Sequence, residues 1–410
     1  MAWEIDLRLD LSRPDWVFGV LWTLCFFGTL LAPESLRVEF NSTFAFLLVF
    51  NIASFFLVYR LFAVCYGPVR VARSQLVSDT AAKQLRGFIK GAFVLWLVLY
   101  LLTIVLSDGL PIMWIFTGDS RTYVDFGVPT LSGFLNMIRG FIFAGCVLLY
   151  LRRDKAKKKL YLLLLTVLLL SSLAEMARGN MLVLLLHGVA MWLIVTPIRF
   201  RGLFHAAWLM IVFILAFGLM GDIRNEGGSS VLGIVDEDSI FNLLPSGFLW
   251  AFLYFVTPAI NVSYAIAEGI EPLYAPFFSV QSLLPTVIRD TAFDPGVYPI
   301  QLKVEAFNAT SFYAPLLADY GVIGTALIVL LLQIVVAYLH VRAVRGSLFH
   351  LLVFPAFYMS VVLSVFYLYF FSLVTVLYPL MAAAYALYCR NSARQAIPSE
   401  RAPDDSVRAD

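Results

Sequence analysis

Residues Ile323 to Val341 read IGTALIVLLLQIVVAYLHV, an apolar run without Asp, Glu, Lys or Arg. A bilayer core of about 30 Å requires about 20 such residues in a helix, so the run predicts a transmembrane span. The whole chain has the same character, because 61% of its 410 residues are hydrophobic, 14% are charged and its mean hydropathy is +0.86. This composition excludes a soluble domain and predicts an all-α polytopic membrane protein.

Similar apolar runs recur along the chain, and together they predict about ten transmembrane helices. The other nine lie near Trp16–Leu31, Thr43–Tyr59, Gly91–Ser107, Gly133–Leu151, Leu160–Leu173, Met181–Val195, Leu203–Leu219, Leu351–Tyr369 and Phe371–Tyr388. The chain accordingly divides into spans 1–7 with short connectors (1–220), a large loop with short or re-entrant helices (221–320), spans 8–10 (321–390) and a tail (391–410). The tail is rich in Ser, Pro, Ala and charge, which predicts disorder.

Lysine and arginine fall mainly on alternate connectors. Cytoplasmic connectors of inner-membrane proteins retain positive charge. An arrangement with both termini inside (N-in, C-in) places 22 of the 29 Lys and Arg residues on the cytoplasmic side. The loop between the seventh and eighth spans then faces outward. Because this topology explains the basic residues, the net charge of +2 indicates no nucleic-acid partner.

The stretch Phe248–Ala267 is apolar enough to be mistaken for an eleventh span. An additional span would reverse the topology and place Arg342, Arg345 and the basic tail outside. Pro258 and Asn261 also interrupt the run. We therefore expect a helix that lies on the outer interface or re-enters within the protein.

Isolated arginines stand on the outward connectors, against the charge gradient. A guanidinium fork matches the oxygens of a phosphate or diphosphate and stays charged in a partly dry site. Arg178 and Arg224 each lie beside Gly and Asn, which favour a turn that aims backbone donors in the same direction. An arginine at the end of a span also contacts lipid headgroups, which explains Arg37 and Arg139 equally well. The candidate ligands are Arg121, Arg139, Arg178, Arg224 and Arg289.

Outward carboxylates are the second requirement for transfer to a sugar hydroxyl, because one of them must take the hydroxyl proton. The candidate substrate-binding acids are Asp222, Glu226, Glu305 and Asp319, and Glu175 is a further outward acid. The run Asp236-Glu-Asp can hold a divalent cation, but short acidic runs are common in loops. We therefore assign no metal.

The outward segments contain no histidine, and the sequence contains no nucleotide-binding motif. His187, His205, His340 and His350 all fall within a span or on the cytoplasmic side, so no outward loop offers an imidazole base. The chain contains neither a Gly-x-x-x-x-Gly-Lys-Ser/Thr motif nor a Gly-x-Gly-x-x-Gly motif after a strand. We expect no cofactor, and any glycosyl or phosphoryl donor must itself be activated for transfer.

A family resemblance emerges from these segments. Asn308–Gly324, NATSFYAPLLADYGVIG, resembles the element that enters a late span in bacterial oligosaccharide repeat-unit polymerases, the O-antigen polymerases of Wzy type. The outward Gly109-Leu-Pro-Ile followed by Arg121 and Phe126-Gly is similar to that family, as is the Arg178-Gly-Asn turn before a leucine-rich span. The placement of the long loop is similar too. The likeness covers most of the chain as topology and short patches as sequence.

The resemblance implies a GT-C-like helical bundle in a bacterial inner membrane, with a periplasmic active face. It implies metal-independent transfer of a growing glycan from undecaprenyl diphosphate onto the next lipid-linked repeat unit of an O-antigen or similar surface polysaccharide. Arg178, Arg224 and Arg289 would be the catalytic ligands of the diphosphate and glycan. The Arg-to-Gly loop spacing of some members is not reproduced after Arg224, where the glycines come too early. The implied partners are undecaprenyl-diphosphate-linked oligosaccharides and membrane lipid, and a chain-length regulator protein stays open.

Three other functions stay open. An O-antigen ligase or another polyprenyl-diphosphate glycosyltransferase has a related topology, although the resemblance would lead one to expect an outward histidine in a ligase. A peptidoglycan polymerase of the shape, elongation and division type shares ten spans and a large late loop, but its motif patches are not found here. A flippase for lipid-linked oligosaccharides would need internal repeats, broken helices and charges deep in the bundle. The predicted outward charges instead gather at the rim.

Overall fold

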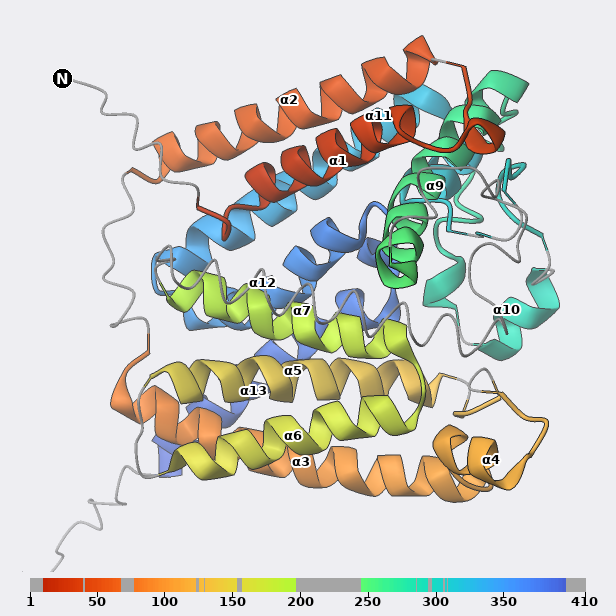
Figure 1. The fold of residues 1–410 in the computed structure, drawn as a ribbon. Coiled ribbons are helices and arrows are strands. Elements are labelled where there is room, and N and C mark those ends of the chain that lie inside the picture. Colours follow the sequence, from red (N-terminus) through yellow and green to blue (C-terminus); the bar gives the residue numbers. More distant parts are fainter. Residues whose placement is uncertain are drawn as a thin grey trace, which may run out of the picture.

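The computed structural model describes residues 10–39, 41–67, 77–122, 125–128, 130–152, 157–196, 245–284, 286–293, 297–304, 307 and 309–395. Within these ranges all regular secondary structure is helical, and no strand is present (Figure 1). The helices are α1 (Pro14–Leu30), α2 (Ser42–Cys65), α3 (Asp79–Leu106), α4 (Pro111–Thr117), α5 (Leu131–Leu151), α6 (Lys158–Ala174), α7 (Arg178–Val195), α9 (Ser246–Glu268), α10 (Thr286–Ala292), α11 (Tyr313–Val344), α12 (Leu348–Leu363) and α13 (Leu373–Gln395).

The helices coincide with the predicted apolar runs wherever the structure describes those runs. The run Leu203–Leu219 lies outside the described residues. Among the described helices, six segments are long and apolar enough to cross a membrane. These are Ser42–Cys65, Asp79–Thr117, Leu131–Leu151, Gly247–Glu268, Tyr313–Val344 and Leu373–Arg390. Gly247–Glu268 contains the stretch Phe248–Ala267, which the sequence analysis did not count as a span, and its length and composition are those of a membrane-crossing helix.

Several helix boundaries differ from the sequence-based expectation, among them the start of α3, which lies at Asp79 and well before Gly91. α12 ends at Leu363 instead of reaching Tyr369, because the chain leaves the helix where the carbonyl of Ser364 accepts a hydrogen bond from the N–H of Phe312 (2.9 Å). α11 begins at Tyr313, well before Ile323, and is broken at Gly321. Gly321 has φ 65° and ψ −172°, a conformation that strains any residue with a side chain.

The long helices run side by side between two ends of the bundle (Figure 1). At the right-hand end in this view lie α4, α9, α10 and the connection from α6 to α7. The connection from α11 to α12 lies at the opposite end. The connectors around α4 and between α6 and α7, which the sequence analysis places outside, therefore lie with α10 at one end, where a shared site can be built.

The core between the helices is aromatic and close-packed. α11 packs against α2 and α12, and α5 packs against α3, α6, α7 and α13. Trp22, Trp96, Tyr161 and Tyr313 are among the largest fully buried side chains. The outer faces of α2, α3 and α11 instead expose large apolar side chains such as Phe46 (67% exposed), Val105 (71%) and Ile323 (78%). Exposed apolar faces on long apolar helices indicate a membrane-embedded protein.

Candidate functional site

α9 forms the wall of the candidate site at the right-hand end of the bundle. In Figure 1 the axis of α9 is steeply inclined to the axis of α1. The two helices pack closely, because a Cβ added at Gly28 of α1 would lie only 2.7 Å from Cγ1 of Val256 on α9. The sequence analysis expected Pro258 and Asn261 to interrupt this segment, but α9 continues through both residues. The helix tolerates them because Pro258 removes only one backbone donor and the side chain of Asn261 finds partners outside the helix.

The amide of Asn261 holds the segment before α11 against α9. Its Nδ2 donates to the carbonyls of Phe307 (3.0 Å) and Ala309 (3.3 Å). Its Oδ1 accepts from the backbone N–H groups of Lys303 (3.1 Å) and Val304 (3.2 Å). Both donors and both acceptor positions of the amide are thus used, and the side chain is completely buried.

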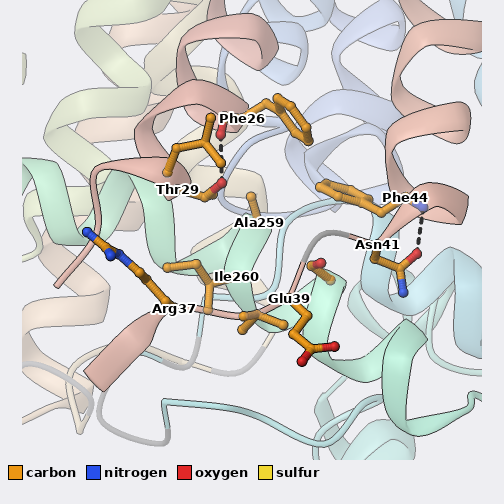
Figure 2. A pocket seen from close by; sticks show the side chains of 11 residues that line it. Phe26, Thr29, Arg37, Glu39, Asn41, Phe44, Ala259 and Ile260 are labelled. Atoms are coloured by element: carbon orange, nitrogen blue, oxygen red, sulfur yellow. Dashed lines mark hydrogen bonds between the residues drawn. The ribbon is translucent and has the colours of Figure 1, made fainter. Parts of the chain in front are cut away.

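A cavity of about 240 Å³ lies between the end of α1, the connector to α2, the start of α2, and α9 (Figure 2). Its apolar lining includes the rings of Phe26 and Phe44 and the side chains of Ala259 and Ile260. Polar groups also line it, from Thr29, Arg37, Glu39, Asn41 and Ser263. Apolar walls with a few polar groups are typical of small-molecule sites.

The polar groups of this cavity differ in how firmly they are held. Asn41 Oδ1 accepts from the N–H of Phe44 (3.0 Å) and so caps α2. Arg37 Nε donates to the carbonyl of Ala32 (3.1 Å), and Nη1 lies 3.8 Å from Glu34 Oε1. Glu39 forms no hydrogen bond or ion pair with the described residues. In Figure 2 the charged ends of Arg37 and Glu39 point away from each other.

Asp319 anchors the outer segment that follows α9. Its Oδ2 accepts from the N–H groups of Phe277 (3.0 Å) and Ser279 (2.7 Å), and its Oδ1 accepts from the N–H of Phe278 (2.9 Å). The carboxylate is fully buried. The sequence predicts that Asp319 binds substrate, but its oxygens are occupied here, because a buried carboxylate needs hydrogen-bond donors and three consecutive backbone amides supply them.

A second contact strengthens this anchor. The N–H of Leu273 donates to the carbonyl of Ala318 (2.9 Å). A Cβ at Gly321 would lie 3.3 Å from Cγ of Pro272, so the outer segment packs directly against the break in α11. The ring centroids of Phe277 and Phe293 lie 4.2 Å apart, and Phe293 directly follows α10, the helix that carries Arg289. Arg289 itself is half-buried.

Arg139 is neither at a lipid headgroup nor open to a ligand. It is 3% exposed and forms a two-pronged ion pair with Glu175, with Nη1–Oε1 at 2.7 Å and Nη2–Oε2 at 3.1 Å. Ser171 Oγ (3.3 Å) and Asn136 Oδ1 accept further hydrogen bonds from the guanidinium. The physical reason is burial, since a charge removed from water needs a complete set of partners.

Arg121 is also held within the protein. Its Nε and Nη2 donate to Asp119 Oδ2 at 3.0 and 2.7 Å, and its guanidinium carbon lies 4.4 Å from the centre of the Trp114 ring. The side-chain hydrogen bond from Arg121 lowers the pKa of Asp119 below its usual value. These contacts order the connector around α4, which exposes Phe116 (84%).

The remaining predicted residues are only partly placed. Arg178 is the first residue of α7, at the end of the short connection from α6 that begins with Glu175. The residues Asp222, Arg224, Glu226, Asp236, Asp238 and Glu305 lie outside the described residues. In the part of the chain that the structure describes, no cluster of three or more His, Cys, Asp or Glu side chains suits a metal ion.

The sequence analysis missed the cavity and the amide residues that build the site. The sequence presents Asn261 only as an interruption of an apolar run and Asn180 only as a turn residue beside Arg178, and it carries no prediction for Asn136. A usable signal was present, because an amide inside an apolar run must find hydrogen-bond partners when buried. Glu39 carried no such signal, since one acid in a connector is ordinary.

Comparisons with known proteins add no relative. No protein-family model, no curated protein and no solved structure matches this chain.

Proposed function

We propose that this protein polymerises lipid-linked oligosaccharide repeat units on the periplasmic face of a bacterial inner membrane. In this proposal it is a metal-independent GT-C-type glycosyltransferase with about ten spans in an N-in, C-in topology. It transfers the growing glycan from undecaprenyl diphosphate to the next repeat unit of an O-antigen or similar surface polysaccharide. The resemblance of Asn308–Gly324 to Wzy-type polymerases motivates the proposal.

One observation carries it further. The connectors with Arg121, Arg178 and Arg289 lie at the same end of the bundle as the cavity beside α9 (Figure 1). Buried hydrogen bonds to Asn261 and Asp319 hold the outer segments at this end in place. An amphipathic cavity at the end of apolar helices, at the same end as these fixed outer segments, suits a substrate with a lipid part and a sugar part.

The proposed chemistry is an inverting displacement at the anomeric carbon of the growing glycan. The acceptor hydroxyl forms the new C–O bond, the bond to undecaprenyl diphosphate breaks, and the diphosphate leaves with the bonding electrons. Arg178, Arg224 and Arg289 stabilise the negative charge that develops on it. The hydroxyl proton passes to a carboxylate. Asp319 has its oxygens occupied, so we assign this role to Glu39 at the cavity.

The cavity beside α9 is the proposed subsite for the acceptor sugar. Its rings offer faces on which a pyranose ring can pack, and its amide, hydroxyl and carboxylate groups can bond to sugar hydroxyls. Arg37 and Glu39 balance in charge, which suits an uncharged sugar. Glu39 lines this subsite, as a base for the acceptor hydroxyl must.

Translocation of lipid-linked oligosaccharides is the second candidate function. It is favoured by the break in α11 at Gly321, because transporters use discontinuous helices near their substrate sites. Ligation of a finished glycan to its final acceptor is the alternative within the glycosyltransferases, and it predicts transfer without chain growth.

The deciding experiment uses proteoliposomes with purified protein and lipid-linked repeat units. Polymerisation predicts a ladder of glycan lengths, whereas translocation predicts single repeats that become protected from a membrane-impermeant reagent. Glu39→Gln and Arg224→Ala should each slow chain growth by about 100-fold or more. The matched control is Glu268→Gln at the end of α9, because Glu268 is exposed and does not line the cavity. Single repeats in every sample, with no ladder from the wild type, reject polymerisation.

A further inference from the structure

The ion pair between Arg139 and Glu175 belongs to a buried network that joins three helices. Arg139 comes from α5, Ser171 from α6, and Asn180 from the first turn of α7. Glu175 Oε2 accepts from both Arg139 Nη2 (3.1 Å) and Asn180 Nδ2 (3.1 Å). Asn136 on α5 meets Asn180 from the other side, with Nδ2 3.5 Å from Oδ1.

Residues of this network lie at both ends of the connection from α6 to α7. Glu175 immediately follows α6, and Asn180 is the third residue of α7. Met176, between them, has φ 53°, a conformation that residues with side chains rarely adopt. Arg178 lies between Glu175 and Asn180, so its backbone position is set by side chains that bond to α5.

Stability alone gives a weak reason for such a network. Removing two charges from water is costly, and apolar side chains of similar volume often replace a buried ion pair without loss of stability. What apolar side chains do not supply is direction, since a two-pronged pair accepts one relative orientation. The network is therefore better suited to fixing a position than to strengthening the fold.

We propose that Arg139, Glu175 and Asn180 are positioning residues that fix the turn carrying Arg178. The proposal rests on the proposed function in one respect, because it takes Arg178 as a ligand of the lipid diphosphate. Its structural part, that the network orders residues 176–180, holds independently of that function.

The test separates positioning from stability by removing both charges together. Arg139→Met and Glu175→Met alone should each lower Tm, because each leaves one buried charge unpaired. The double variant should regain the wild-type Tm. Even so, hydrogen–deuterium exchange in peptides covering 175–183 should rise by about tenfold or more, as expected for local opening. The KM for the lipid diphosphate donor should rise with it.

Two further variants sharpen the comparison. Asn180→Ala removes the hydrogen bonds to Glu175 and Asn136 and no charge, and it should also speed exchange in the turn at an almost unchanged Tm. The control is Arg13→Met with Asp15→Met, which removes another ion pair (2.6 Å), here between a partly buried Arg13 and a buried Asp15 near the start of α1. This control should leave exchange at 175–183 and the donor KM as in the wild type.

The outcomes distinguish the two proposals. Wild-type exchange in the turn of the double variant would overturn the positioning role, whatever the activity. Faster exchange in the turn, with no glycan transfer by the wild type, would support positioning and reject the polymerase. Faster exchange with an unchanged donor KM would show that the ordered turn does not serve donor binding, which overturns the link to Arg178.

Discussion

Oδ2 of Asp319 lies 2.7 Å from the backbone nitrogen of Ser279, across a sequence separation of 40 residues. The hydrogen bond belongs to a set of three consecutive amides that converge on one buried carboxylate. Successive backbone N–H groups form concave binding sites for anions. Here the protein fills such a site with its own side chain and thereby fixes the outer segment between α9 and α10 to α11.

Asp319→Asn should release this segment. The substitution replaces one acceptor oxygen by an amide donor that faces backbone donors, and it removes the charge that strengthens the other bonds. We expect the free energy of unfolding to fall by about 2 to 3 kcal/mol. Hydrogen exchange in residues 272–284 should rise more than exchange in α5. Glu34→Gln, at a highly exposed side chain, should change stability by less than about 0.5 kcal/mol. An unchanged exchange rate in 272–284 would contradict the anchoring role.

Gly140 on α5 should not tolerate alanine. A Cβ there would lie 3.2 Å from His187 Nε2 and 3.3 Å from two carbons of the same ring. His187 is completely buried and its Nδ1 lies 2.7 Å from the carbonyl of Val183, so the ring has little freedom to move away. Gly140→Ala should destabilise the protein by about 1 to 3 kcal/mol in thermal or denaturant unfolding.

Gly91 on α3 provides the matched control for Gly140. An added Cβ at Gly91 meets nothing within 4 Å, and alanine is the better helix former. Gly91→Ala should therefore be neutral or stabilising by up to about 1 kcal/mol. Equal destabilisation by both substitutions would show that helix packing at Gly140 is looser than the distances indicate.

Ser263→Trp should block the cavity beside α9. Ser263 lines the cavity and is only partly buried, so a large ring can occupy the space without displacing a core side chain. If the acceptor sugar binds there, acceptor KM should rise by about tenfold or more, since a lost buried contact is worth more than about 1.4 kcal/mol. Ala267→Trp, on an exposed face of the same helix, should leave the acceptor KM unchanged. A normal acceptor KM in Ser263→Trp would place the acceptor elsewhere.

The cysteines allow a direct test of the predicted sidedness. Cys65 is exposed at the end of α2, on the predicted cytoplasmic side, whereas Cys25 and Cys146 are buried. With Cys389 replaced by alanine, a membrane-impermeant maleimide added to intact cells should not label Cys65. Glu34→Cys, in the connector from α1 to α2, should be labelled. Labelling of Cys65 from outside, with Glu34→Cys protected, would reverse the topology on which the proposed periplasmic site depends.

Much of the helical layout follows from local properties of the chain. Apolar runs of sufficient length form helices whatever their neighbours, because in lipid each backbone N–H and C=O must be satisfied within its own segment. For this reason each described run coincides with a helix, to within a few residues for Gly133–Leu151 in α5, although α3 and α11 begin well before the predicted runs. The break in α11 was not foreseen, because Gly321 and Gly324 in the sequence are equally compatible with close packing in a straight helix.

The sequence by itself determined where the apolar helices lie, and through its charges it predicted which connectors share a side. Only the tertiary structure decided the partners of the polar residues. Arg139 was compatible with a headgroup or a substrate, and it binds Glu175, 36 residues away. Asp319 was compatible with catalysis, and it binds backbone amides. The physical reason is the distance along the sequence over which each property is determined. Hydrophobic length and charge bias are read within one segment, whereas a buried polar group takes whichever partner the packing of distant helices brings within about 3 Å.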